Sequence, residues 1–197
     1  MTRIIAGSAR GRRLVVPSGR STRPTADRAR EGLFSTLEAL TGTLSGARLL
    51  DLYAGSGAVG LEALSRGATA SLLVESDHGA ARAIRTNIEA VGLPGAQLVT
   101  TRVERLVAGP VVGAAYDIGF LDPPYDLGDD AVRDVLGDAL VHGWLVRHAV
   151  VAVERATRDR PWTWPAGFAA GRSRTYGEAT LWYGHAGPSP APSPTEE

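Results

Sequence analysis

The chain has 197 residues and no net formal charge at pH 7, with 44% hydrophobic and 21% charged residues. This composition is ordinary for one globular domain with its own core, and no apolar run reaches the roughly 18 residues of a membrane helix. The absence of cysteine excludes disulfides, thiolate zinc sites and cysteine nucleophiles, and the four histidines lack metal-ligand spacing. We therefore expect a cytoplasmic monomer with neither a metal site nor a membrane partner.

The two signs of charge are separated along the chain. Residues 1–30 hold eight arginines and one acid, whereas residues 117–138 hold seven aspartates and one arginine, and all 21 basic residues are arginine. Arginine forms paired hydrogen bonds with phosphate and stacks on bases. The N-terminal cluster is therefore either a solvated basic arm or a contact to a polyanion. The candidate RNA-binding residues are Arg10, Arg12, Arg13, Arg20 and Arg23.

The apolar pattern predicts a small N-terminal hairpin followed by alternating strands and helices. Short strands over 3–6 and 12–16 surround a glycine-containing turn, and 17–24 form a turn-rich link. Thr25 is the expected N-cap of a helix over 26–40. Beyond it, strands are expected at 48–52, 70–74, 97–101, 116–121 and 149–154, and helices at 58–66, 79–91 and 129–142.

Strands separated by helices predict a parallel, doubly wound sheet. The pattern changes after residue 154, where 172–176 and 179–183 flank Gly177-Glu178 and predict an antiparallel hairpin. The expected fold is therefore α/β and Rossmann-like, with a mostly parallel seven-stranded sheet, a C-terminal antiparallel hairpin and a small N-terminal β-hairpin extension. The expected divisions are 1–24 for the basic hairpin or arm, 25–184 for the catalytic domain and 185–197 for a disordered tail.

The tetrapeptide Asp122-Pro123-Pro124-Tyr125 follows the apolar strand predicted over 116–121. Open α/β sheets bind ligands at this carboxyl edge. The two prolines donate no backbone hydrogen bond and hold φ near about −65°, so the loop is stiff and its carbonyls are available as acceptors. An acidic acceptor, a carbonyl and a flat ring suit a planar group with an exocyclic amine, such as a nucleobase. The alternative is a structural turn with a packing tyrosine.

A glycine-rich turn joins the first strand of the alternation to its helix. Gly55, Gly57 and Gly60 satisfy the dinucleotide pattern G-x-G-x-x-G, and Glu75 follows where it suits ribose hydroxyls. Asp51, however, would repel a pyrophosphate, and it favours a ligand that carries an ammonium and a sulfonium. S-adenosylmethionine (SAM) is therefore favoured over NAD. The candidate cofactor residues are Asp51, Tyr53, Ala54, Gly55, Ser56, Gly57, Glu75, Ser76, Arg102 and Val103.

These motifs together resemble those of the class I SAM-dependent methyltransferases that modify exocyclic amines. Three further segments carry a closer resemblance: Gly7 with Gly11-Arg12-Arg13-Leu14, residues 22–34, and Arg174-Thr175-Tyr176-Gly177. Over about residues 3–184 the chain is similar to the RsmD family of bacterial 16S ribosomal RNA guanine-N2 methyltransferases. The resemblance implies methyl transfer from SAM to the N2 of a guanine in 16S rRNA, within the 30S subunit or an assembly intermediate.

One segment departs from the general methyltransferase pattern. Many of these enzymes place Asp or Asn after the third strand to bind the adenine of SAM, whereas this chain has Thr101-Arg102-Val103-Glu104. Backbone groups near Val103, or the Glu104 side chain, are the alternatives for this contact.

In the expected mechanism, the Asp122 carboxylate and the Pro123 carbonyl accept the two N2–H groups of guanine, which aims the nitrogen lone pair at the methyl group. Pro124 stiffens the loop and Tyr125 stacks on the base. The alternatives are an N6-adenine DNA methyltransferase, a protein-amine methyltransferase and a non-catalytic RNA-binding assembly factor. The small size argues against a built-in DNA-reading domain, and the presence of Asp51, Glu75 and Asp122 argues against a non-catalytic role.

Overall fold

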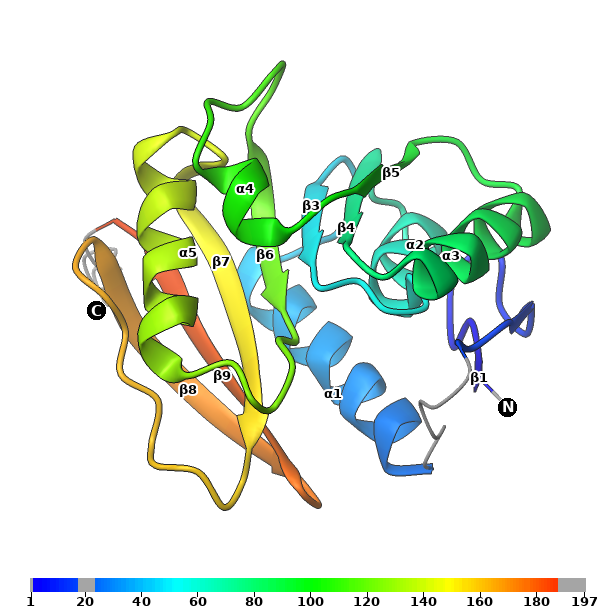
Figure 1. Ribbon diagram of the computed structural model, residues 1–197. Helices are drawn as coiled ribbons and strands as arrows, with labels where there is room; N and C mark the ends of the chain where they lie inside the picture. The colour runs from blue at the N-terminus through cyan, green and yellow to red at the C-terminus, as the bar shows by residue number, and fades with distance from the viewer. Residues whose placement is uncertain (1, 18–23, 188–197) are drawn as a thin grey trace, which may run out of the picture.

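The structure is a computed structural model that describes residues 2–17 and 24–187. A seven-stranded sheet with strand order β5-β4-β3-β6-β7-β9-β8 forms its centre (Figure 1). Strands β3 to β7 pair in parallel, and β9 runs antiparallel to both β7 and β8. The predicted fold class is therefore confirmed. The strands are β3 (Arg48–Leu52), β4 (Ala70–Glu75), β5 (Ala96–Thr100), β6 (Tyr116–Leu121), β7 (Leu145–Ala156), β8 (Phe168–Tyr176) and β9 (Ala179–Ala186).

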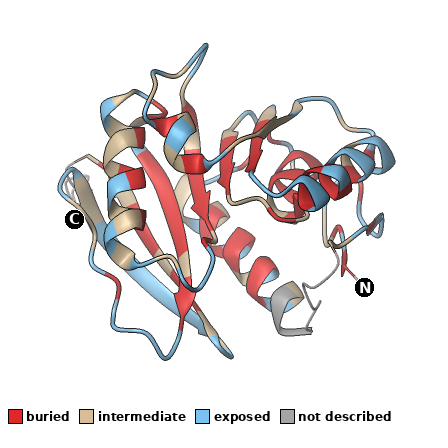
Figure 2. Ribbon diagram, in the orientation of Figure 1, coloured by how far each residue is buried: buried red, intermediate tan, exposed pale blue. Residues whose placement is uncertain are grey.

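Helices lie on both faces of the sheet, and the central strands β3, β4, β6 and β7 are largely buried (Figure 2). In β3, Leu49 packs in the cluster that contains α1 and α2 residues, whereas Leu50 and Leu52 pack in the cluster that contains α4 and α5 residues. This alternation follows from the two-residue period of a strand. The helices are α1 (Pro24–Thr41), α2 (Ala58–Ser65), α3 (His78–Val91), α4 (Val103–Val107) and α5 (Asp129–Val141).

Several predicted boundaries were wrong. Helix α1 begins at Pro24, so Thr25 lies inside the helix and is not its N-cap; proline is favourable in the first turn, where its missing N–H costs no hydrogen bond. Strand β7 begins at Leu145 instead of residue 149, with His148 at φ 66°. Strand β9 continues to Ala186, so residues 185 and 186 belong to the sheet and not to a tail. Residues 188–197 lie outside the described part of the chain.

The N-terminal hairpin is shorter than predicted. Strands β1 (Thr2–Arg3) and β2 (Arg13–Leu14) pair antiparallel over two residues each. The intervening segment instead packs on α2, where the backbone amides of Ile5 and Ala6 donate to the Glu62 carboxylate at 2.7 and 2.9 Å. Ile4, Ala9 and Leu14 are buried in the core. The described N-terminal residues are therefore integrated with the central domain, whereas the sequence suggested an arm outside it.

Among the described residues, no helix is both long and apolar enough to cross a membrane.

The turn of this hairpin contains two glycines with similar backbone angles and different surroundings. Gly7 has φ 79° and Gly11 has φ 85°. A Cβ at Gly7 would collide with the Ser65 backbone carbonyl on α2, whereas a Cβ at Gly11 would meet nothing within 4 Å. The left-handed conformation penalises alanine at both positions, and only Gly7 adds a steric clash.

We expect Gly11→Ala to lower the free energy of unfolding by about 1–2 kcal/mol, the cost of a left-handed L-residue. Gly7→Ala should cost at least about 1 kcal/mol more because α2 or the hairpin must move. Urea unfolding of the two variants beside the native protein measures both values. Equal losses would show that the close approach to Ser65 contributes nothing.

Candidate active site

A cavity of about 220 Å³ opens at the carboxyl ends of the central strands. Because β3, β6 and β7 are parallel, the residues that follow them meet at one edge of the sheet. Asp51, Asp122 and Glu154 come from these three strands and all line the cavity. The remaining walls come from the glycine-rich turn, from α1 and from the N-terminal segment. The cavity thus brings together Asp51, three residues of the glycine-rich turn (Tyr53, Ala54 and Ser56) and the first residue of the Asp-Pro-Pro-Tyr loop. Its lining does not include the other predicted site residues, among them Glu75, Pro123, Pro124 and Tyr125.

The glycine-rich turn depends on left-handed backbone conformations. Tyr53, Gly55 and Gly57 have φ values of 65°, 59° and 75°, and the Gly57 amide donates to the Ala54 carbonyl at 2.8 Å. Gly60 has a packing role: a Cβ there would collide with Ser71 and Leu73 of β4. The third glycine of the pattern therefore lets α2 approach the sheet closely.

Asp51 is a buried acid at the centre of the site. Its side chain is 1% exposed, and its Oδ2 accepts from the Gly60 amide at 3.0 Å. Burial, with smaller contributions from the nearby charges of Asp122 and Glu75, raises the pKa of Asp51 to about 8, against the lowering effect of the Gly60 hydrogen bond. A cation bound beside Asp51 would remove this penalty, so the site is suited to a positively charged ligand.

Glu75 connects the glycine-rich turn to the end of β4. Its Oε2 accepts from the Gly55 amide and its Oε1 accepts from the Asp77 amide, both at 2.8 Å. The carboxylate is 7% exposed. Each carboxylate oxygen can accept more than one hydrogen bond, so this arrangement fixes the Glu75 carboxylate and leaves acceptor capacity. Ser76, the next residue, is exposed.

The segment Thr101-Arg102-Val103-Glu104, where many methyltransferases have an Asp or Asn that binds adenine, leads into the short helix α4. Arg102 is the N-cap of α4 and is exposed, Val103 is buried, and neither lines the cavity. Glu104 instead accepts a hydrogen bond from the Tyr53 hydroxyl at 3.0 Å. Burial, followed by the effect of Glu104, raises the pKa of Tyr53. The Tyr53–Glu104 contact therefore joins α4 to the glycine-rich turn.

The loop after β6 is anchored on both sides. The Leu127 amide donates to the Pro124 carbonyl at 3.0 Å, and Arg155 of β7 donates to the Leu127 carbonyl at 2.9 Å. Asp122 is half-buried and Pro123 is buried. Tyr125 is 74% exposed, which does not fit the structural alternative of a packing tyrosine.

Glu154 is the site residue that the sequence analysis missed. It lies in β7 and shares the cavity with Asp122. Burial, followed by the negative charge of Asp122, raises the pKa of Glu154 to about 8. The available signal was an acid near the carboxyl end of an apolar strand that is parallel to the strand before Asp122.

The N-terminal segment is connected to the glycine-rich turn by Asn87 of α3. This side chain is fully buried; its Oδ1 accepts from the Val15 amide, and its Nδ2 donates to the carbonyls of Val15 and Ser56, at 2.7, 2.9 and 2.8 Å. Ser56 lies in the glycine-rich turn and lines the cavity. The side-chain amide of Asn87 thus bonds to two segments that are far apart in the sequence. The sequence pattern gave no indication of this contact.

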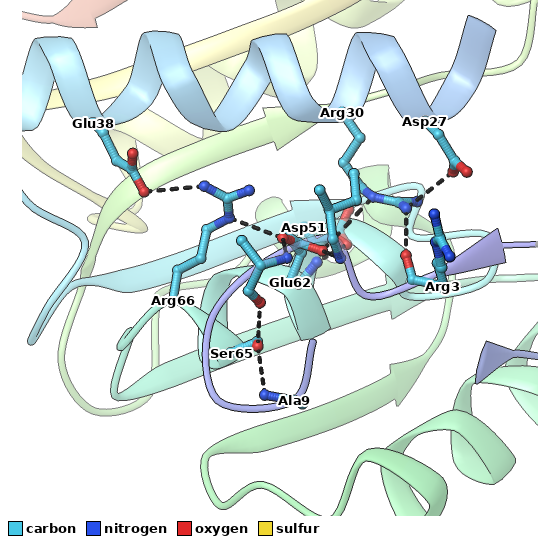
Figure 3. A network of polar contacts seen from close by, with 12 residues as sticks. Arg3, Ala9, Asp27, Arg30, Glu38, Asp51, Glu62, Ser65 and Arg66 are labelled. Atoms are coloured by element: carbon cyan, nitrogen blue, oxygen red, sulfur yellow. Dashed lines mark hydrogen bonds and ion pairs between the residues drawn. The ribbon is translucent and has the colours of Figure 1, made fainter. Parts of the chain in front are cut away.

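The arginines of the N-terminal region divide into exposed and buried groups. Arg10, Arg12 and Arg13 are exposed, and Arg12 donates to the Ala90 carbonyl at 2.6 Å. Arg20 and Arg23 lie outside the described residues. Arg30 is 7% exposed and donates to Asp27 and to the Arg3 carbonyl, in the network shown in Figure 3. Arg30 therefore stabilises the packing of α1 on the N-terminal segment, and it also borders the cavity.

Glu62 is the centre of that network (Figure 3). Besides the amides of the N-terminal segment, it contacts Arg66 at 2.9 Å and Arg30 at 4.0 Å. Arg66 in turn pairs with Glu38 of α1 at 3.2 Å. A fully buried acid in this way joins α2 to α1 and to the N-terminal segment.

The described residues contain no group of three or more His, Asp or Glu side chains that could hold a metal ion.

Comparison with known proteins shows the family of this chain. The family model described as "Conserved hypothetical protein 95" matches residues 2–185. Ribosomal RNA small subunit methyltransferase D of Escherichia coli is 35% identical over 176 residues, which cover 89% of this chain and 85% of that protein. The Haemophilus influenzae protein of the same name is 31% identical over 177 residues, 89% of each chain. The chain belongs to the RsmD family.

Solved structures agree with this membership. The yhhF protein of Escherichia coli has a TM-score of 0.80 and 32% identity, with coverage of 95% of this chain and 99% of its own. A hypothetical protein of Thermus thermophilus has a TM-score of 0.76 and 32% identity, with coverage of 93% and 98%. The magnesium protoporphyrin IX methyltransferase of Synechocystis, solved with bound SAM, shares the fold at 13% identity and a TM-score of 0.63, with coverage of 85% and 86%. As a member of the RsmD family, the protein is a SAM-dependent methyltransferase.

The buried amide of Asn87 should stabilise both the N-terminal segment and the glycine-rich turn. We expect Asn87→Ala to lower the free energy of unfolding by about 1–3 kcal/mol, because it removes three hydrogen bonds from partly buried backbone groups. Asn87→Asp should cost at least as much, since a carboxylate would face the carbonyls of Val15 and Ser56. The measurement is chemical unfolding, with Thr86→Ala as the exposed control on the same helix. An Asn87→Ala variant as stable as the Thr86→Ala control would contradict this role.

Proposed function

We propose that this protein transfers a methyl group from SAM to the exocyclic N2 of a guanine in 16S ribosomal RNA, within the 30S subunit or an assembly intermediate. The main support is the position of the Asp122 loop: a half-buried carboxylate borders the same cavity as Asp51, and an exposed tyrosine follows two prolines. The similarity to small-subunit rRNA methyltransferases over most of the chain supports RNA as the substrate class.

The residues of the glycine-rich turn fit the cofactor. Asp51 is a buried acid whose pKa is raised by burial and by neighbouring acids, and the ammonium of SAM would favour its ionised form. Glu75 accepts the ribose hydroxyls with the lone pairs that its backbone contacts leave available. The backbone at Val103, at the start of α4, contacts the adenine, because the nearby Glu104 is already paired with Tyr53. When bound, SAM supplies an electrophilic methyl group.

The Asp122 loop positions the acceptor nitrogen. Guanine N2 is a weak nucleophile because its lone pair is delocalised into the ring. Asp122 and the Pro123 carbonyl accept its two N–H hydrogens and thereby direct the lone pair toward the methyl group. The exposed Tyr125 ring stacks on the base and fixes its plane, once the base has left its own stack. In such an in-line transfer the N2–CH3 bond forms as the S–CH3 bond of SAM breaks, the neutral thioether leaves, and Asp122 is placed to accept the proton that the methylated nitrogen loses. Positioning and electrostatics supply most of the rate.

The test of this function uses SAM with a labelled methyl group and three acceptors: unmodified 30S particles, protein-free 16S rRNA and genomic DNA. N2-methylguanosine released from the rRNA is the expected product. Comparison of the first two acceptors shows whether ribosomal proteins belong to the substrate. Label recovered as N6-methyladenine from DNA would overturn the proposal in favour of the DNA alternative.

Asp122→Ala should lower kcat at least about a hundredfold, because the group that orients the amine is lost. The dissociation constant for SAM should change less than about threefold, well under the ~1.4 kcal/mol of a tenfold change. Asp126→Ala, an exposed acid in the same loop, is the control. A variant at position 122 that retains most of its activity would exclude this role.

Asp51→Asn should weaken SAM binding at least about tenfold, because an ion pair in a buried site is lost. The same substitution should stabilise the empty protein. The pKa of Asp51 is raised to about 8 in the fold, so ionisation of this buried carboxyl costs stability as pH rises from about 4 to 8. The gain in stability should therefore be larger at pH 9 than at pH 5. Calorimetric titration and thermal unfolding at the two pH values measure these effects, with Glu89→Gln as an exposed control.

The exposed N-terminal arginines are proposed to contact rRNA phosphates. Arg10→Gln and Arg13→Gln should each weaken RNA binding and reduce the slope of log K against log salt by roughly one. Arg147→Gln is the charge-matched control. Arg147 is exposed near the start of β7, at the end of the strand away from the cavity, so its replacement should leave the slope unchanged. Filter binding at several salt concentrations gives the slopes, and identical values for all three variants would exclude this surface.

A further inference from the structure

The cavity contains a second carboxyl group beside Asp122, and the mechanism above gives it no role. Strands β6 and β7 pair in parallel with Leu121 opposite Val153. Asp122 and Glu154 are the next residues on the two strands, so they lie beside each other just past the last β6–β7 pair. Asp122 follows the end of β6, whereas Glu154 is still in β7, opposite Leu181 of β9, and both residues line the cavity. Asp51 lines the same cavity from β3, on the other side of β6.

The surroundings of Glu154 make this placement costly. Phe120, Leu33 and Leu181 supply apolar wall to the same cavity. Arg30, the arginine that borders it, donates to Asp27 and to the Arg3 carbonyl. Burial and the neighbouring Asp122 accordingly raise the pKa of Glu154 to about 8. A half-buried acid next to another acid lowers stability, and hydrogen-bond donors supplied by a ligand would offset this cost.

Two adjacent acceptors require two adjacent N–H donors. On its Watson–Crick edge, guanine presents the N2 amine directly beside a protonated ring nitrogen, N1–H. Adenine and cytosine present their exocyclic amine beside an unprotonated ring nitrogen, which is an acceptor and would repel an ionised Glu154. The N1–H of guanine, by contrast, donates to the carboxylate and so favours its ionised form. Pairing of donors with acceptors in a buried site gives strong discrimination, because a mismatched base leaves a polar group unpaired.

We propose that Glu154 reads the target base together with Asp122: Asp122 accepts from the exocyclic amine, and Glu154 accepts from N1–H of the same guanine. This inference rests on the proposed function and adds to it the residue that distinguishes guanine from other bases with an exocyclic amine. Glu154 is then a substrate-contacting specificity residue, and its repulsion with Asp122 is relieved by the two donors of the base.

The test compares guanine with 2-aminopurine, which keeps the C2 amine and has an unprotonated N1. The base is placed at the methylated position of 16S rRNA, located first with the wild-type enzyme, and the RNA is assembled into particles if the wild type requires them. The wild type should prefer guanine. In Glu154→Gln, the amide can donate to the unprotonated N1, so the ratio of kcat/KM for guanine over 2-aminopurine should fall about tenfold or more. 2-Aminopurine also lacks the O6 of guanine. This difference affects the wild type and Glu154→Gln alike, so it cancels when their kcat/KM ratios are compared.

Two further variants separate base reading from a structural role. Glu154→Leu, which neither donates nor accepts, should lose activity on guanine and most of the preference. Glu89→Gln, exposed on α3, should match the wild type. SAM affinity and unfolding are measured for each variant, and Glu154→Gln should be at least as stable as the wild type because a half-buried acid beside Asp122 is removed.

The outcomes distinguish the inference from the proposed function. An unchanged preference in both Glu154→Gln and Glu154→Leu, while the wild type still makes N2-methylguanosine, overturns the inference alone. Formation of N6-methyladenine by the wild type overturns both, because adenine has no N1–H. A fall in the preference for guanine without a loss of SAM affinity supports the inference.

Discussion

The parallel arrangement of β3, β6 and β7 brings three carboxyl groups close together at one edge of the sheet. The properties of the site depend on which hydrogen-bond donors or positive charges offset the repulsion between these groups. Asp51, Asp122 and Glu154 meet at one edge of the sheet because each comes from the carboxyl-terminal part of a parallel strand or from the residue after it. The Gly60 amide compensates Asp51 only partly, since the pKa of Asp51 remains raised to about 8. The fold therefore holds these acids in an unfavourable environment, which a cationic cofactor together with a base rich in N–H donors would relieve. The cost in stability is thus coupled to ligand binding.

A second buried acid, Glu62, determines where the N-terminal segment lies. Its carboxylate accepts from two successive backbone amides of that segment and pairs with Arg66. Asn87 then connects the same segment to Ser56 in the glycine-rich turn. The region proposed to contact RNA and the turn proposed to bind SAM are therefore parts of one hydrogen-bonded structure. A displacement of one would disturb the other through Asn87.

The sequence was informative where a local pattern carries the chemistry. The order of strands and helices followed from apolar periodicity, and Asp51, Glu75 and Asp122 could be located because each lies near the end of an apolar strand. Glu62 and Asn87 were missed, because a single acid or amide inside a predicted helix looks like a solvent-facing residue until the N-terminal segment is placed on it. Glu154 was missed because its neighbour Asp122 becomes apparent only from the register of β6 with β7. Helix α4, with five residues, is too short to show a helical period.

The separation of charge along the chain has a physical reason within the proposed function. An acidic cavity repels the phosphates of RNA, so the backbone of the substrate must be held elsewhere, and the exposed arginines of the N-terminal segment are suited to that contact. The base itself is neutral and presents N–H donors, so it can enter a site that the backbone cannot. Phosphate contacts then position the RNA, while the carboxyl groups select the base. A chain with no net charge can thus bind a polyanion, because its arginines and its buried acids contact different parts of the same substrate.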